Sequence, residues 1–188
     1  MDEATLFRLG GYSALAAVPA LLLAGVFLAL FFGGFGDRYG PLNDIFSALV
    51  LLLSVAPALA VAGLLSEQTG GWFGVLTGLA VLGMLIGAVG QMALVLGGIS
   101  LPTSFVTGGI GIMPVLLWFG ATAFIVLRGG QLPAIIGWLL VASLGLALLL
   151  TLASMWRLGI ATWALSVALL VALCGWYGAL GLELLQRA

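Results

Sequence analysis

The chain has 188 residues, of which 64% are hydrophobic and only 6% are charged, and its formal net charge is −1. Water-soluble domains carry about 25% charged residues, so this composition excludes a soluble globular protein. A nearly neutral chain also lacks the basic surface that nucleic-acid binding requires. We therefore expect an integral membrane protein that contacts membrane lipids and binds no nucleic acid.

Six apolar stretches account for nearly the whole sequence. Each is longer than the ~20 residues that a helix needs to cross the hydrocarbon core of a bilayer. In chain order the predicted spans are residues 9–32, 42–65, 72–96, 105–127, 133–155 and 160–185. The sequence predicts an all-α integral membrane protein, in which residues 1–188 form a single domain of six transmembrane helices.

The lengths of the connections predict how the spans are arranged. Short connections make consecutive helices antiparallel neighbours, which gives a compact up-down bundle. An even number of crossings places both termini on the same side of the membrane. Pro19, Pro57 and Pro114 fall inside predicted spans, where membrane helices tolerate proline, and we expect each of them to bend its helix.

The arginines predict the orientation. Arg8, Arg128 and Arg187 belong to the side of the termini. Arg38 and Arg157 belong to the opposite side. Because cytoplasmic loops carry the excess of positive charge, this distribution favours cytoplasmic termini.

Small residues predict where helices pack, because close backbone approach holds helices together in lipid. The predicted third span carries Gly74 and Gly78 on one side. Gly83, Gly87 and Gly90 lie on roughly the opposite side of the same helix. We expect this helix to be the packing centre of the bundle, with a neighbour on each side. A surplus of such faces would also suit a partner protein.

Two further patterns concern packing. The predicted first span repeats Ala16, Ala20 and Ala24 at intervals of four residues, which predicts another contact stripe. Trp176 lies near a predicted span end, where an indole suits the membrane interface, whereas Trp138 lies deeper and is expected to pack inside the bundle.

Polar residues are scarce inside the spans, where they mark transport or relay sites. Asp44, Ser47 and Ser54 share one face of the second predicted helix, and Gln91 is the only amide well inside a span. These four residues define a candidate polar path. The alternative is structural: Asp44 would compensate the helix dipole, and the others would form hydrogen bonds within or between helices.

The composition also limits the chemistry of the chain. It contains no histidine and one cysteine, and its five basic residues are all arginine. It therefore offers no imidazole ligand, no Schiff-base lysine and no histidine-based catalytic triad. We expect no catalytic site, no metal and no cofactor. A noncovalently bound lipid or pigment stays compatible with the sequence, because such binding needs no ionisable ligand.

Two short segments carry a resemblance to a known group of proteins. Residues 128–138, RGGQLPAIIGW, join the fourth and fifth predicted spans, and residues 8–11, RLGG, lead into the first. Both resemble segments of uncharacterised bacterial six-helix inner-membrane proteins of the domain-of-unknown-function type. The resemblance implies a multi-pass protein of the bacterial inner (plasma) membrane and no particular activity.

Two functions fit this sequence. The favoured one is a small accessory or scaffolding subunit of a larger membrane protein assembly, which binds other subunits or itself and has no catalytic site. The alternative is a small transporter or sensor for an apolar or lipid-like molecule that binds between the helices.

Overall fold

The computed structural model describes residues 2–129, 131–156 and 159–188. Within these ranges the helices are α1 (Glu3–Phe32), α2 (Tyr39–Leu53), α3 (Val55–Thr69), α4 (Gly71–Val95), α5 (Leu101–Gly129), α6 (Ala134–Met155) and α7 (Gly159–Gln186). Because α3 continues α2, the described chain has six helical segments that are long and apolar enough to cross a membrane. The predicted all-α, six-helix membrane fold is confirmed.

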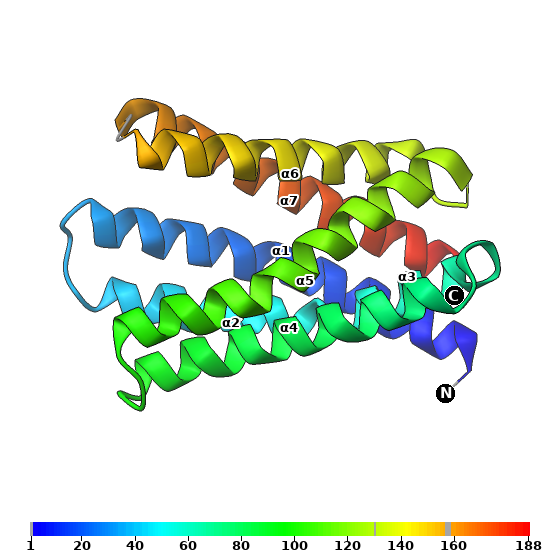
Figure 1. The fold of residues 1–188 in the computed structure, drawn as a ribbon, viewed down its shortest axis with the longest axis horizontal. Helices are drawn as coiled ribbons and strands as arrows, with labels where there is room; N and C mark the ends of the chain where they lie inside the picture. Colours follow the sequence, from blue (N-terminus) through cyan, green and yellow to red (C-terminus); the bar gives the residue numbers. More distant parts are fainter. Residues whose placement is uncertain (1, 130, 157–158) are drawn as a thin grey trace.

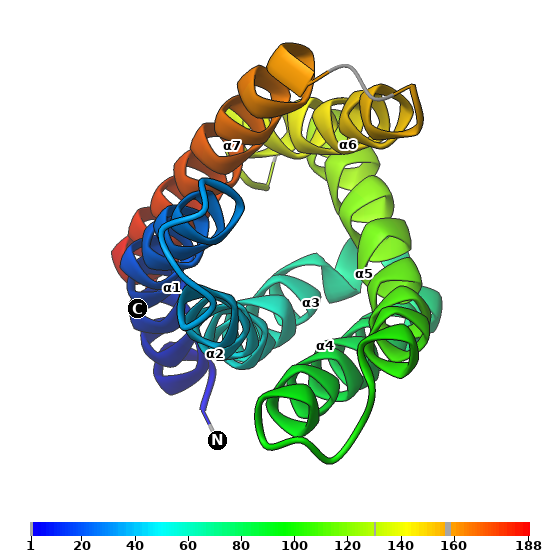
Figure 2. The same cartoon turned by 90° about the vertical axis from the view of Figure 1, so that its left-hand side faces the viewer.

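The six spans form a ring when the bundle is seen end-on (Figure 2). Contacts join α1 to α2, α2 to α4, α4 to α5, α5 to α6, α6 to α7, and α7 back to α1. Both termini lie at one end of the bundle, the terminal end, as Figure 1 shows. The connections at residues 33–38 and 96–100 lie at the other end, the loop end.

Pro57 accounts for the division of the second span into two helices. Proline has no N–H to bond the Leu53 carbonyl, and its ring crowds that carbonyl, so regular helix is interrupted about one turn earlier. The interruption falls at Ser54, between α2 and α3. After it, α3 contacts α1, α4 and α7 and lies toward the inside of the ring (Figure 2). Pro19 and Pro114, in contrast, lie inside the uninterrupted helices α1 and α5.

Most of the helices extend beyond the predicted spans. Hydropathy marks only the part of a helix that suits hydrocarbon, whereas helical hydrogen bonds continue past it. For α1 the extension has a clear cause, because Asp2 caps the helix and its Oδ1 accepts a hydrogen bond from the Thr5 amide at 2.9 Å. α2 begins at Tyr39 with Pro41 in its first turn, where the missing N–H of proline needs no partner.

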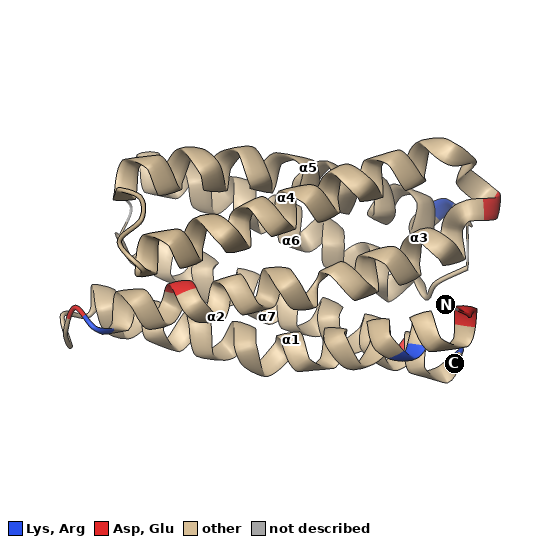
Figure 3. Cartoon of the chain, turned by 90° about the horizontal axis from the view of Figure 1, so that it is seen from below, with Lys and Arg blue, Asp and Glu red and all other residues tan. Residues whose placement is uncertain are grey.

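Charged residues lie mainly toward the two ends of the bundle (Figure 3). At the terminal end, Arg187 forms an ion pair with Glu183 at 2.7 Å and also donates to the Gln131 carbonyl. Arg8 donates to the Ala188 carbonyl at 3.3 Å. Arg157 lies outside the described residues.

α4 and α5 cross with almost no space between their backbones. A Cβ added at Gly83 would overlap the carbonyl oxygen of Gly111, and a Cβ at Gly111 would lie 2.6 Å from the carbonyl oxygen of Gly83. A Cβ at Gly87 or Gly90 would lie 2.9 Å from a side chain of α2 or α5, respectively. The predicted glycine face of α4 therefore packs against its neighbours.

The second predicted glycine face of α4 is not a contact within the chain. Gly74 and Gly78 are exposed, and a Cβ at either position would meet no atom within 4 Å. α4 does lie between α5 on one side and α2 and α3 on the other. Its contacts near the terminal end use larger buried side chains, among them Phe73 and Thr77. The prediction that Gly74 and Gly78 contact a neighbouring helix of this chain was therefore wrong.

The predicted alanine stripe of α1 is correct at two of its three positions. Ala20 and Ala24 are buried, but Ala16 is exposed. The buried stripe continues instead through Ala17 and Ala14, because a helix face advances by alternating steps of three and four residues.

Candidate functional site

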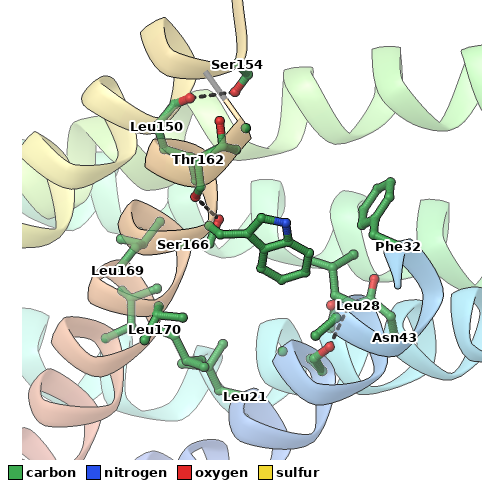
Figure 4. A pocket seen from close by; sticks show the side chains of 18 residues that line it. Leu21, Leu28, Phe32, Asn43, Leu150, Ser154, Thr162, Ser166, Leu169 and Leu170 are labelled. Carbon is green, nitrogen blue, oxygen red and sulfur yellow. Dashed lines mark hydrogen bonds between the residues drawn. The ribbon is translucent and has the colours of Figure 1, made fainter. Parts of the chain in front are cut away.

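The loop half of the bundle contains a cavity of about 760 Å³ between α1, α2, α6 and α7. Figure 4 shows this larger cavity, with leucines of α1 and α7 on facing walls. Its volume lies in the range of small-molecule binding sites. The lining residues are Leu21, Ala24, Gly25, Leu28, Ala29, Phe32, Asn43, Ser47, Leu150, Ser154, Gly159, Thr162, Trp163, Ser166, Val167, Leu169, Leu170 and Leu173.

Several polar side chains of the larger cavity are bonded to helix carbonyls. Asn43 of α2 donates from Nδ2 to the Ala24 carbonyl of α1 at 2.9 Å. The hydroxyls of Ser154 and Ser166 donate to carbonyls one turn earlier in their own helices, at 2.5 and 2.8 Å (Figure 4). Since their hydroxyl protons are already used, these two serines present only acceptor lone pairs to the cavity.

A smaller cavity of about 340 Å³ lies between α1, α2, α4 and α5. It adjoins the larger cavity, because Leu21 and Ser47 line both. The glycines of the α4–α5 crossing form part of its wall, and Gln91 lines it from α4. None of the described residues that line either cavity is charged.

The terminal half is filled by aromatic side chains instead. The rings of Trp118 and Trp176 lie 6.3 Å apart, and Tyr177 lies 4.7 Å from Trp176. Nε1 of Trp118 donates to the hydroxyl of Thr77 at 2.9 Å. Phe73 stacks on Trp118 with 6.3 Å between ring centroids. Both cavities lie toward the loop end, away from this cluster.

Two of the four predicted polar-path residues come together. Ser47 and Gln91 both line the smaller cavity. Ser54 is buried and its hydroxyl lies 2.5 Å from the hydroxyl of Tyr177, so it joins α7 at the helix break. Asp44 is half-buried and lines neither cavity.

Sequence reasoning missed several residues of this region. Asn43 was not predicted as a site residue, although it links α2 to α1 beside the larger cavity. Trp176 was expected at the interface but is 2% exposed, and Trp138 was expected to pack but is 60% exposed. The spacing of Thr162 and Ser166 places two hydroxyls on one face of α7, and this pattern could have indicated the wall of the larger cavity.

No protein-family model matches this chain, and neither curated proteins nor solved structures gave a match. Among the described residues, no group of three or more His, Cys, Asp or Glu side chains is arranged to hold a metal ion. The expectations of no metal, no cofactor and no catalysis stay predictions. The two cavities are therefore the features from which a function can be inferred.

Proposed function

We propose that this protein binds an apolar or lipid-like molecule between its helices, as a small membrane transporter or sensor. The larger cavity carries this proposal. The side chains that line a space of about 760 Å³ lack van der Waals contacts on the side that faces it. An alkyl chain bound in this space would supply those contacts. Its lining is mostly apolar with a few polar groups, which is the usual composition of a small-molecule site.

The setting that we propose is the bacterial inner membrane, with both termini in the cytoplasm. Arg8 and Arg187 lie at the terminal end of the bundle, where their side chains contact Ala188 and Gln131. Arg128 ends α5 at the same end. This positive charge supports a cytoplasmic terminal end. We assign the protein no catalytic activity and no cofactor.

The test is to fill the larger cavity. Ser166→Phe places an aromatic ring among the lining residues of α7. Val171→Phe is the matched control, because it adds the same ring to an exposed position of α7 that lines neither cavity. Each protein is purified in mild detergent, and the bound lipid is extracted and quantified by mass spectrometry.

We expect the wild type and Val171→Phe each to carry nearly one bound amphiphile per protein. Ser166→Phe should carry several-fold less, and its thermal stability should be unchanged. Equal amounts in all three proteins would contradict the proposal.

A second candidate is an accessory or scaffolding subunit of a membrane assembly. The observation that favours it is the exposed pair Gly74 and Gly78 on α4, since small residues on a lipid-facing surface allow another helix to approach closely. Gly78→Leu should then abolish copurification of a stoichiometric partner from the native membrane. Val141→Leu, on the exposed face of α6, is the control and should preserve it. Unchanged copurification in Gly78→Leu would reject this candidate.

A further inference from the structure

Two polar side chains at the junction of the cavities lack protein partners. Oε1 of Gln91 is buried and accepts no hydrogen bond in the described part of the chain. The hydroxyl of Ser47, which lines both cavities, makes none there either. Buried polar groups nearly always have a partner, so the unpaired Oε1 of Gln91 beside a cavity points to a ligand group. Ser47 is half-buried, and its hydroxyl can bind the same group from α2.

Other unpaired polar atoms do not point to a site. Oγ1 of Thr122 and Nε1 of Trp176 are buried and unpaired among the described residues, but neither residue lines a cavity. Ser154 and Ser166 do line the larger cavity, but their hydroxyls already donate to helix carbonyls. Among the described residues that line the cavities, Gln91 is the one with a buried unpaired polar atom, and Ser47 supplies the hydroxyl of the same smaller cavity.

The chemistry of the two groups defines what they recognise. An amide has both a donor end and an acceptor end, and the broad, two-fold terminal torsion of glutamine lets either end face the cavity. A serine hydroxyl also donates and accepts. A hydroxyl group on the ligand is complementary to both, because it too donates one hydrogen bond and accepts others.

The ligand should also be uncharged. The head group lies in the smaller cavity, where no charged side chain of the described residues forms part of the wall; Asp44, three residues before Ser47, is not part of it either. A charged head group placed here would lose its hydration without gaining a counter-ion, which is strongly unfavourable in an apolar environment.

The two cavities together suit a molecule with a head and a chain. Because Ser47 and Leu21 belong to both linings, a head group in the smaller cavity would lie next to the larger one. We propose that Ser47 and Gln91 bind the hydroxyl head group of an uncharged long-chain alcohol, whose alkyl chain lies in the larger cavity between α1 and α7. This inference rests on the proposed function and adds the class of ligand and the residues that select it.

The experiment uses two probes with the same chain, one with a hydroxyl head group and one in which a methyl group replaces the hydroxyl proton. Radiolabelled hexadecanol and its methyl ether have the same chain, but the ether has no hydroxyl proton. Binding of each probe to the purified full-length protein in detergent is measured at equilibrium. The wild type should bind the alcohol about tenfold more tightly than the ether, as expected for one or two buried hydrogen bonds.

The variants Ser47→Ala and Gln91→Leu should each reduce this ratio toward one while the ether binds as before. Ser143→Ala is the matched control. Its hydroxyl bonds its own helix at the Leu139 carbonyl and lines neither cavity, so the ratio should not change. Size-exclusion profiles and melting temperatures establish that each variant is folded. If one variant fails to fold, the other still tests the proposal, because Ser47 and Gln91 belong to different helices.

The outcomes separate the two proposals. If the wild type binds alcohol and ether equally and Ser166→Phe abolishes both, the cavity binds alkyl chains but the hydroxyl site is overturned. The same conclusion follows if the wild-type preference persists in both Ser47→Ala and Gln91→Leu. If the wild type binds neither probe, both this inference and the proposed binding of an apolar chain are rejected.

Discussion

The two halves of the bundle differ in how their interiors are occupied. In the terminal half, Trp118, Trp176 and Tyr177 fill the interior, and α3 lies toward the inside of the ring. In the loop half, α2 stays in the wall of the ring, and two adjoining cavities occupy the interior. The break at Ser54 separates these two arrangements. The break before Pro57 therefore coincides with the boundary between the filled half of the bundle and the half that contains the cavities.

The largest expected difference concerns two leucines of α7. Leu180 is fully buried in the terminal half, whereas Leu169 lines the larger cavity and is half-buried. Leu180→Ala should lower the free energy of unfolding by about 2–4 kcal/mol, because a new cavity opens in a packed core. Leu169→Ala should cost less than about 1 kcal/mol, because much of its surroundings is already empty. Equilibrium unfolding in mixed detergent micelles measures both, and equal losses would remove the distinction between the two halves.

The α4–α5 crossing gives the next largest effect. Gly83→Ala puts a methyl group against the Gly111 backbone, which has no flexible atom to move aside. The expected loss of stability is about 1–3 kcal/mol. Gly74→Ala on the same helix meets no atom within 4 Å and should change stability by less than about 0.5 kcal/mol. The same unfolding assay compares them, and a Gly83→Ala protein as stable as the wild type would show that the helices do not cross so closely.

The hydrogen bond at the helix break should contribute less. Tyr177→Phe removes the partner of the Ser54 hydroxyl, which still donates to the Val50 carbonyl. We expect a loss of about 1 kcal/mol. Tyr12→Phe, at an exposed position of α1, should have no measurable effect on the melting temperature. Identical melting temperatures for the two variants would exclude a stabilising role for this bond.

The smallest effect lies at the start of α1, far from the cavities. Hydrogen bonds from the side chain and the backbone of Thr5 lower the pKa of the Asp2 carboxyl below its ordinary value of 3.8. Because the pKa is lower in the folded chain, the cap stabilises α1 fully above pH 3.8 and loses this effect as the pH falls through the folded-state pKa. The NMR shift of the Thr5 amide should follow this titration in the wild type and be independent of pH in Asp2→Asn. A pH-dependent shift in Asp2→Asn would assign the change to another group.

Much of the fold is predictable from the sequence, because a membrane span must be long and apolar. All six spans were predicted, and Gly83, Gly87 and Gly90 were placed on a contact face of α4. Which of the two glycine faces contacts a neighbouring helix could not be predicted, because the spacing of the glycines defines both faces equally well.

The cavities were less predictable than the helices. Gln91 and Ser47 stand out in the sequence as polar residues within spans. Whether they line the same cavity depends on how α2 and α4 are rotated about their axes in the ring. The burial of Trp176 and the exposure of Trp138 also depend on rotation, which apolar sequence leaves unspecified when every face of a helix is hydrophobic.

The most direct test of the binding proposal is to locate a bound alkyl chain. A hexadecanol analogue with a diazirine on its chain is incubated with the protein in detergent, photolysed, and the labelled residues are identified by mass spectrometry. Labels should concentrate on Leu28, Leu150 and Leu170, which face the larger cavity from three helices, and should disappear in Ser166→Phe. Labels confined to lipid-facing positions such as Leu117 and Val171, with no change in Ser166→Phe, would contradict the account.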